Sequence, residues 1–127
     1  MQVFELDINE IKPYANNPRH NDDAVPAVMR SIKEFGFKVP LVIDKNNEII
    51  TGHTRYKACQ MLGIKKIPCV RADDLTEQQV KAFRIADNKV SEIATWDDGK
   101  LKIELQEIEF DMSDLGQMRY FIGLEIL

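Results

Sequence analysis

The sequence predicts a single domain that mixes short strands with helices. Its 127 residues suffice for one hydrophobic core of ordinary size. Short aliphatic runs alternate along the chain with longer segments in which apolar residues recur at helical spacing. Asparagine, proline and glycine separate these segments, where they favour turns.

The first third of the chain is predicted to form a strand, a turn and a helix. Residues 3–6 form the strand, and the asparagines and proline of residues 16–21 predict a turn. A helix is expected over residues 23–35, with Pro26 in its first turn, where a missing N–H costs little, and Gly36 at its end. Four apolar residues share one face of this helix: Val25, Val28, Ile32 and Phe35.

A hairpin and a second helix follow. Residues 39–43 form a strand, residues 44–47 its turn, and residues 48–51 the returning strand. The second helix is expected to begin at His53 and to end at Leu62, before a glycine.

The next segment is predicted to form a strand and a capped helix. Residues 66–70 form the strand, in which Pro68 indicates an edge or an end. Thr76 and Gln79 form a capping box, so a helix is expected over residues 77–88. Its inner face is expected to be apolar, with Val80, Phe83 and Ala86.

A last helix and an apolar tail complete the chain. Asp97 opens this helix, and Trp96 is expected to anchor the joint before it in the core. Its apolar residues are Leu101, Leu105 and Ile108. The tail over residues 112–127 is apolar and needs cover. Whether it folds back, meets a partner or marks the point where a longer protein was cut stays open.

Composition excludes several classes of protein. The net charge of −4 argues against a chain that grips DNA along its backbone by itself. Cys59 and Cys69 lie in apolar patterns and make neither a disulfide framework nor a zinc site. The sequence shows no signal-peptide pattern and no apolar run of membrane-spanning length, so a cytoplasmic location without membrane contact is expected.

The segment from Glu48 to Ala58 carries the clearest chemical signal. An apolar pair runs into Gly52, donor-rich residues follow, and helix-forming residues continue the chain. Backbone N–H groups and the positive end of the helix dipole therefore point into the turn. Glycine lets a phosphate approach the backbone, and Arg55 adds a forked cation. The pattern predicts an anion site for a nucleotide or nucleic-acid phosphate, and the alternative is a plain turn with a surface arginine.

Two residues inside this turn have open roles. Three roles are open for His53: it donates to a phosphate, it acts as a general acid or base, or it only satisfies hydrogen bonds of the turn. Thr54 is expected either to contact a phosphate or to cap the helix.

Three blocks of sequence occur in an order and at a spacing that are specific to one family. These blocks are Asn17-Pro18-Arg19, Gly52-His53-Thr54-Arg55-Tyr56-Lys57-Ala58 and Ala86-Asp87-Asn88-Lys89. They resemble the ParB/sulfiredoxin superfamily, and specifically the ParB-like N-terminal domain, over the span from Phe4 to Ile108. The segment from Arg84 to Asp97 is most similar to the branch found with phage-type DNA-modification methyltransferases.

What the resemblance implies for the fold is an α+β domain with a small mixed β-sheet and flanking helices. The ParB-like N-terminal domain is expected to occupy residues 1–110. Residues 111–127 are expected to be an apolar tail or the beginning of a truncated following region.

The resemblance also implies roles for single residues. Gly52 and Arg55 match the glycine and the last arginine of a turn that binds nucleotide phosphates. Partitioning ParB proteins, which bind and hydrolyse CTP with magnesium, use this turn, and sulfiredoxin uses it for ATP. His53 and Thr54 occupy its variable middle. Arg19 resembles an arginine near the nucleotide base or phosphate.

The same resemblance implies further ligands. Asn17, in the block of Arg19, is a candidate nucleotide ligand. Asp87 and Asn88 resemble a Glu-Asn pair that places magnesium and triphosphate in the CTP-binding members, and their oxygens are hard ligands that suit magnesium. The implied cofactors are CTP or ATP with Mg²⁺, and the candidate catalytic residues are His53 and Asp87.

Three positions depart from the family pattern. Sulfiredoxin has its reactive cysteine directly after the turn glycine, where this chain has His53, so peroxiredoxin repair is not expected. Thr54 and Ser91 stand where CTP-binding members have arginines, which leaves CTP specificity and hydrolysis open.

We expect a nucleotide- or phosphate-binding domain that acts in DNA modification, partition or mobile-element regulation. One alternative is a magnesium-dependent nuclease or NTPase of the same family. Another is a protein-interaction module with a decayed ligand site. The expected partner is DNA, reached directly or through a fused or partner protein such as a DNA methyltransferase, and a homodimer is also considered. The base, the DNA sequence and the extent of the full-length protein stay open.

Overall fold

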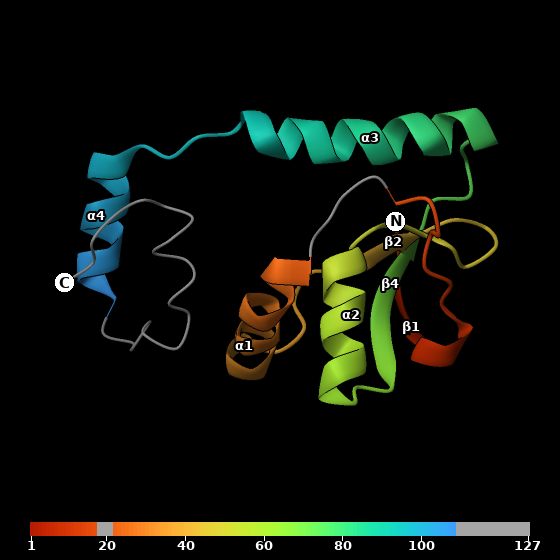
Figure 1. Cartoon of the computed structure of the whole chain (residues 1–127), viewed down its shortest axis with the longest axis horizontal. Coiled ribbons are helices and arrows are strands. Elements are labelled where there is room, and N and C mark those ends of the chain that lie inside the picture. The colour runs from red at the N-terminus through yellow and green to blue at the C-terminus, as the bar shows by residue number, and fades with distance from the viewer. Residues whose placement is uncertain (18–21, 109–127) are drawn as a thin grey trace.

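The computed structural model describes residues 1–17 and 22–108. In chain order the elements are β1 (Val3–Asp7), the 3₁₀ turns η1 (Ile8–Glu10) and η2 (Asp22–Ala24), α1 (Val25–Phe35), β2 (Leu41–Ile43), β3 (Ile49–Thr51), α2 (His53–Leu62), β4 (Lys66–Arg71), α3 (Glu77–Ile93) and α4 (Asp98–Glu107). Helices α1 and α2 stand together beside the sheet, and α3 passes across its end (Figure 1).

The four strands form one mixed sheet in the order β1-β4-β2-β3. β1 pairs with β4, and β2 with β3, in antiparallel fashion, whereas β2 and β4 run parallel. The predicted hairpin is therefore confirmed, as is the α+β class with a small mixed sheet. Asp44 closes the hairpin turn, because its carboxylate accepts hydrogen bonds from the backbone N–H groups of Asn46 (2.8 Å) and Glu48 (2.9 Å).

The prediction that Pro68 marks an edge or an end of its strand is wrong. β4 lies inside the sheet, between β1 and β2. Its register with β2 begins only at Cys69, opposite Leu41, so at Pro68 the strand is paired on the β1 side alone. A residue without an N–H is tolerated there because no second ladder requires that donor.

The hydrophobic core joins the sheet to α1 and α2, which pack against each other. Its most enclosed members come from β2, β3, α2 and β4: Leu41, Ile43, Ile49, Ala58, Cys59, Ile67 and Cys69. Val25 and Ile32 join from α1 as predicted, but Phe35 is exposed. Phe35 is the last residue of α1, where Gly36 turns the chain away with a positive φ of 80°.

Helix α3 begins as predicted and runs further. The Thr76 hydroxyl oxygen accepts from the Gln79 N–H (3.1 Å), and the Gln79 side chain accepts from the Thr76 N–H (2.9 Å), which confirms the capping box. The helix continues to Ile93 instead of ending at Asn88.

The predicted apolar inner face of α3 is wrong. Val80 is half-buried, but Phe83 and Ala86 are exposed, and the residue that α3 buries deeply is Arg84. The helix therefore contacts β3 through a polar residue, because Arg84 donates to the Ile49 carbonyl of that strand.

Helix α4 begins at the predicted cap, where the Asp97 carboxylate accepts from the Lys100 N–H (3.0 Å). The helix lies away from the sheet at the far end of α3 (Figure 1). Trp96 is 58% exposed, so the prediction that it anchors this joint in the core is wrong, because the link between α3 and α4 has already left the core. The apolar tail over residues 112–127 lies outside the described residues. Within residues 1–17 and 22–108, no helix combines the length and the apolar character needed to cross a membrane.

Truncation of a core residue of β4 tests this arrangement. Ile67 is fully buried between β1 and the helices, and Ile67→Ala should lower the free energy of unfolding by about 2–5 kcal/mol through lost burial and the cavity left behind. Val39→Ala is the matched control, because Val39 is exposed. Equal midpoints for the two variants in urea unfolding would contradict the core described above.

Candidate functional site

The glycine turn, residues 52–55, joins β3 to α2. Gly52 has φ of 105°, a conformation that favours glycine, and precedes the first residue of the helix. A Cβ at this position would lie 2.4 Å from Cδ2 of Leu41, so only hydrogen fits. The Tyr56 N–H closes the first helical turn on the Gly52 carbonyl (2.9 Å). The N–H groups before it therefore have no acceptor inside the helix, which makes this end of α2 suited to an anion.

Arg55 lies over Gly52. A Cβ on the glycine would come 3.0 Å from Nη2 of Arg55, and that same Nη2 donates to the Pro40 carbonyl (3.1 Å). Nε of Arg55 is buried without a hydrogen-bond partner. Burial lowers the pKa of Arg55, and the Asp87 carboxylate opposes this shift. The guanidinium is thus held against the turn, with the charge of Asp87 acting on it.

His53 is bonded to the loop before α1. The ring is 9% exposed, and its Nε2 accepts a hydrogen bond from the Tyr14 backbone N–H (3.2 Å). Burial, and then the charges of Arg84 and Lys57, lower the pKa of His53 to about 4. The imidazole is therefore neutral at pH 7, with its proton on Nδ1. Nε2 is committed to holding the turn, and the catalytic role of His53 stays a prediction.

Asp87 and Asn88 lie on α3, one turn after the buried Arg84; Asp87 is exposed and Asn88 is half-buried. The Asn88 Nδ2 donates to the Arg84 carbonyl (3.1 Å), one turn earlier on the same helix. Asp87 is close enough to Arg55 to raise the pKa of that guanidinium. The structure thus places Arg55 against Gly52, and the charge of Asp87 on α3 acts on that guanidinium; the ligand roles of these residues stay predictions.

For the other predicted site residues, the structure gives burial and backbone contacts. Thr54 is half-buried in the first turn of α2. Asn17 is half-buried, and its backbone N–H donates to the Tyr14 carbonyl (3.2 Å). Arg19 lies outside the described residues. Cys59 is buried, which raises the pKa of its thiol to about 11, so it is protonated and unreactive at neutral pH.

Sequence reasoning missed Arg84. This residue is 3% exposed, its Nη2 donates to the Ile49 carbonyl (3.0 Å), and its guanidinium lies 3.6 Å from the centre of the Tyr14 ring. Glu48 is a more distant ion-pair partner at 3.8 Å. The signal that could have found it is the polar series of Arg84, Asp87 and Asn88, which share one helical face at spacings of three and four residues.

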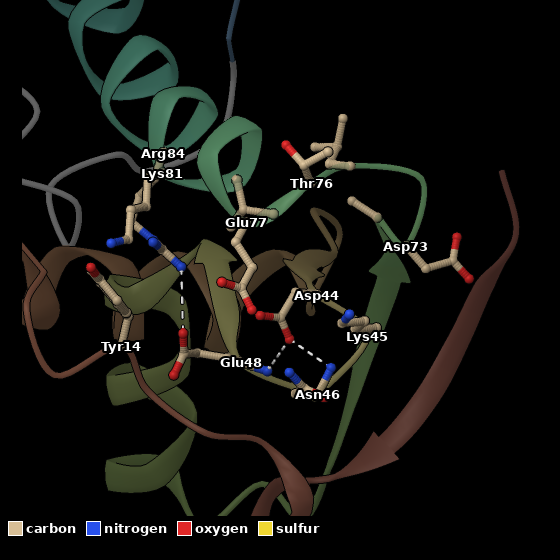
Figure 2. Close-up of a pocket in the computed structure, with 13 residues that line it drawn as sticks. Tyr14, Asp44, Lys45, Asn46, Glu48, Asp73, Thr76, Glu77, Lys81 and Arg84 are labelled. Atoms are coloured by element: carbon tan, nitrogen blue, oxygen red, sulfur yellow. Dashed lines mark hydrogen bonds and ion pairs between the residues drawn. The ribbon is translucent and has the colours of Figure 1, made fainter.

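A separate pocket of about 220 Å³ lies beneath the first turns of α3, against the hairpin turn (Figure 2). Side chains of both charges line it: Asp44, Lys45, Glu48, Glu77, Lys81 and Arg84. Of the predicted site residues that the structure describes, none lines this pocket. Tyr14 also lines it and connects it to the glycine turn, since the Tyr14 N–H is bonded to His53. Within the described ranges, no group of three His, Cys, Asp or Glu side chains is arranged to hold a metal ion.

Comparison with protein families gives one clear match. A model of the ParB N-terminal domain matches residues 1–89. The ParB-like nuclease domain-containing protein YnaK of Escherichia coli is 40% identical over 80 residues, which cover 62% of this chain and 92% of that protein. A probable chromosome-partitioning protein ParB of Rickettsia felis is 33% identical over 67 residues, 51% of this chain. The chain spans only 23% of that partitioning protein's length.

Solved structures agree on the fold. The C-terminally truncated chromosome-partitioning protein ParB of Caulobacter crescentus, complexed with CTP-gamma-S, superposes with a TM-score of 0.74 over 99% of this chain and 73% of that chain. Its identity is 18%, so it shows the fold alone. Sulfiredoxin of Arabidopsis thaliana is 26% identical, with a TM-score of 0.55 over 65% of this chain and 97% of that chain.

Alanine substitutions at two glycines with positive φ distinguish a steric clash from backbone strain. Gly52→Ala should destabilise the fold by about 3 kcal/mol or more, because its Cβ meets both a disfavoured φ and Leu41. Gly63→Ala, at φ of 72° with no atom within 4 Å of the added Cβ, should cost only about 1–2 kcal/mol. Thermal unfolding of both variants measures the difference. Equal costs would show that the space at Gly52 is not restricted.

The buried histidine predicts a pH dependence. Its pKa of about 4 in the fold lies below the ordinary 6.5, so protons bind more readily to the unfolded chain. The contribution of His53 to stability is complete above pH 6.5 and is lost as the pH falls toward 4, by up to about 3 kcal/mol. His53→Gln keeps an acceptor for the Tyr14 N–H without a titrating ring. Urea unfolding between these pH values should therefore give a flatter profile for this variant.

The other histidine supplies the control. His20→Gln should leave the slope of wild type unchanged over the same pH range. A slope abolished by His20→Gln and kept by His53→Gln would contradict the assignment to His53.

Proposed function

The chain belongs to the ParB N-terminal domain family, and on this premise we propose that it binds the phosphate groups of a nucleoside triphosphate at the glycine turn. One observation carries the proposal. At the N-terminal end of α2, Gly52 leaves room for hydrogen alone and Arg55 lies over it, while the charge of Asp87 on α3 raises the pKa of that guanidinium. A plain connecting turn requires neither feature.

The proposed chemistry at the turn is that of an oxyanion cradle. The first N–H groups of α2 donate to phosphate oxygens, and the helix dipole favours the negative charge. Arg55 is already held by the Pro40 carbonyl through Nη2, so its remaining N–H groups approach the ligand from a fixed direction. The neutral His53 ring brings no positive charge of its own and holds the turn in shape through Tyr14.

Magnesium fits the residues on α3. The Asn88 Nδ2 donates to its own helix, and an amide oxygen and a carboxylate, such as those of Asn88 and Asp87, are the hard ligands that Mg²⁺ takes. One or two such oxygens completed by phosphate oxygens and water are a common magnesium site. When bound, the ion would neutralise triphosphate charge, and Asp87 and Asn88 would hold it.

Relatives of known structure support the nucleotide class. The Caulobacter neighbour was solved with CTP-gamma-S, and a free serine kinase neighbour, at a TM-score of 0.51, was solved with AMP. These two proteins share a fold and differ in their nucleotide, so both CTP and ATP are candidates here. Thr54 and Ser91 replace arginines of the CTP-binding pattern, so the preferred nucleobase has to be determined by experiment. Asn17 and Arg19 are proposed as further nucleotide ligands.

We place this binding in a DNA-associated process. Several relatives are chromosome-partitioning proteins, and the family resemblance also includes domains of DNA modification systems. The net charge of −4 favours contact with DNA through a partner or fused protein, of which a methyltransferase is one candidate, over self-sufficient DNA binding. A homodimer and a cytoplasmic setting belong to the same proposal.

Hydrolysis is the second candidate function, because the E. coli relative carries the name of a nuclease domain. In that case Asp87 would act through the magnesium ion, and Asp87→Asn would lose turnover while nucleotide binding persists. The described residues hold no dense carboxylate cluster, so binding without rapid hydrolysis is favoured.

Calorimetry against CTP, ATP and GTP, with and without Mg²⁺, tests the proposal. Arg55→Met should weaken the preferred nucleotide at least tenfold, about 1.4 kcal/mol, because a charge-assisted phosphate contact is lost. Arg30→Met is the matched control on exposed α1 and should bind as wild type does. Absence of binding to all three nucleotides at millimolar concentration, or equal affinities for the two variants, would contradict it.

A further inference from the structure

We propose that Arg84 is a positioning residue of the phosphate site: it fixes α3 on β3 and Tyr14, so that Asp87 and Asn88 face the glycine turn. This inference rests on the nucleotide-binding function proposed above and assigns a role to a residue that does not itself touch the phosphate turn. Four observations carry it.

The first observation is the anchoring of Arg84. The guanidinium is bonded to the Ile49 carbonyl at 3.0 Å and lies 3.6 Å from the centre of the Tyr14 ring. Glu48 offers a counter-charge at 3.8 Å, and Nε has no hydrogen-bond partner. Burying a guanidinium whose Nε lacks a partner costs free energy of folding. The burial of Arg84 is therefore not explained by stability alone.

The second observation is what α3 lacks. Among its described side chains the larger apolar ones are exposed, from 36% for Phe83 to 76% for Ile93, with Ile85 and Val90 between them. Hydrophobic burial therefore contributes little to the orientation of the helix on the sheet. With Val80 only half-buried, Arg84 is the deepest contact between α3 and β3.

The third observation is the helical register. Asp87 and Asn88 follow Arg84 by three and four residues, so they lie on the same face about one turn, roughly 5 Å, further along. Asn88 is bonded back to the Arg84 carbonyl, and Asp87 acts on Arg55. A rotation of α3 about its axis at Arg84 would carry both candidate magnesium ligands away from the turn.

The fourth observation is that Tyr14, which contacts Arg84, is itself bonded to the glycine turn. The Tyr14 ring that stacks on Arg84 belongs to the residue whose backbone N–H is bonded to His53, directly after Gly52. Arg84 is thus connected to the glycine turn along two routes, through Tyr14 to His53 and through Ile49 to β3, the strand that leads into Gly52. These contacts fix the position of α3 relative to the turn.

A double-mutant cycle tests the inference. Mg²⁺-dependent affinity for the preferred nucleotide is measured for Arg84→Met, Asp87→Asn and the pair, below 20 °C, with folding verified by circular dichroism. Arg84→Met alone should weaken binding about tenfold, and in the Asp87→Asn background it should weaken it less than about twofold, because the group it positions is already lost.

Two further variants separate positioning from general destabilisation. Arg84→Lys keeps a cation that donates to the Ile49 carbonyl and should bind within about threefold of wild type. Lys81→Met removes a cation one turn earlier that lines the same pocket, and should bind as wild type does. Additive losses from Arg84→Met and Asp87→Asn, or no rescue by lysine, would overturn the inference.

Amide hydrogen exchange supplies a readout without nucleotide. Arg84→Met should lower the protection of residues 80–90 while the protection of β1 and β4 is unchanged, and Arg84→Lys should restore it. If wild type binds no nucleotide, the proposed function fails and exchange alone decides whether Arg84 docks the helix. Unchanged protection of α3 in Arg84→Met would overturn that docking role in either case.

Discussion

The orientation of α3 depends on a buried arginine rather than on apolar packing. Arg84 reaches under the helix to the Ile49 carbonyl and the Tyr14 ring, and in the turn that follows it only Asn88 is half-buried. An ordinary surface helix shows the opposite arrangement, with its apolar stripe toward the core. In this chain the core is complete without α3, because α1, α2 and the sheet enclose it. The helix is therefore not required for the core, and its carboxylate and amide groups carry the magnesium role that we propose.

The glycine turn shows how packing and chemistry constrain one another. Leu41, a core residue, approaches Gly52 so closely that a side chain there is excluded, and Gly52 stands at the helix end whose first N–H groups have no acceptor within the helix. Arg55 is held above the glycine by the Pro40 carbonyl and faces the charge of Asp87. His53 keeps a neutral ring in a partly cationic environment and ties the turn to Tyr14. The backbone of the candidate site is thus fixed by packing, and the side chains of Arg55 and His53 are each held by a hydrogen bond.

Local signals in the sequence predicted most of the secondary structure. Gly36 and the Thr76–Gln79 box mark helix ends through contacts within a few residues, and the β2–β3 hairpin follows from its turn. The turn at Gly52 that leads into α2 was predicted because it is local as well, whereas the phosphate role of Gly52 and Arg55 stays a prediction. The inward face of α3, the exposure of Trp96 and the interior place of Pro68 depend on which elements pack together, which periodicity does not encode. Arg84 was missed for that reason, since its partners lie 35 and 70 residues away in sequence: Ile49 and Tyr14.

The central claim is that α2 and α3 meet at the glycine turn to hold a triphosphate. Backbone amide chemical shifts during titration with CTP or ATP and Mg²⁺ test it most directly. The account predicts that the largest changes fall on residues 53–55 and 87–88, with small changes in the hairpin turn of residues 44–48. Changes concentrated on residues 44–48 and 73–81, around the pocket beneath α3, with the glycine turn unmoved, would contradict it.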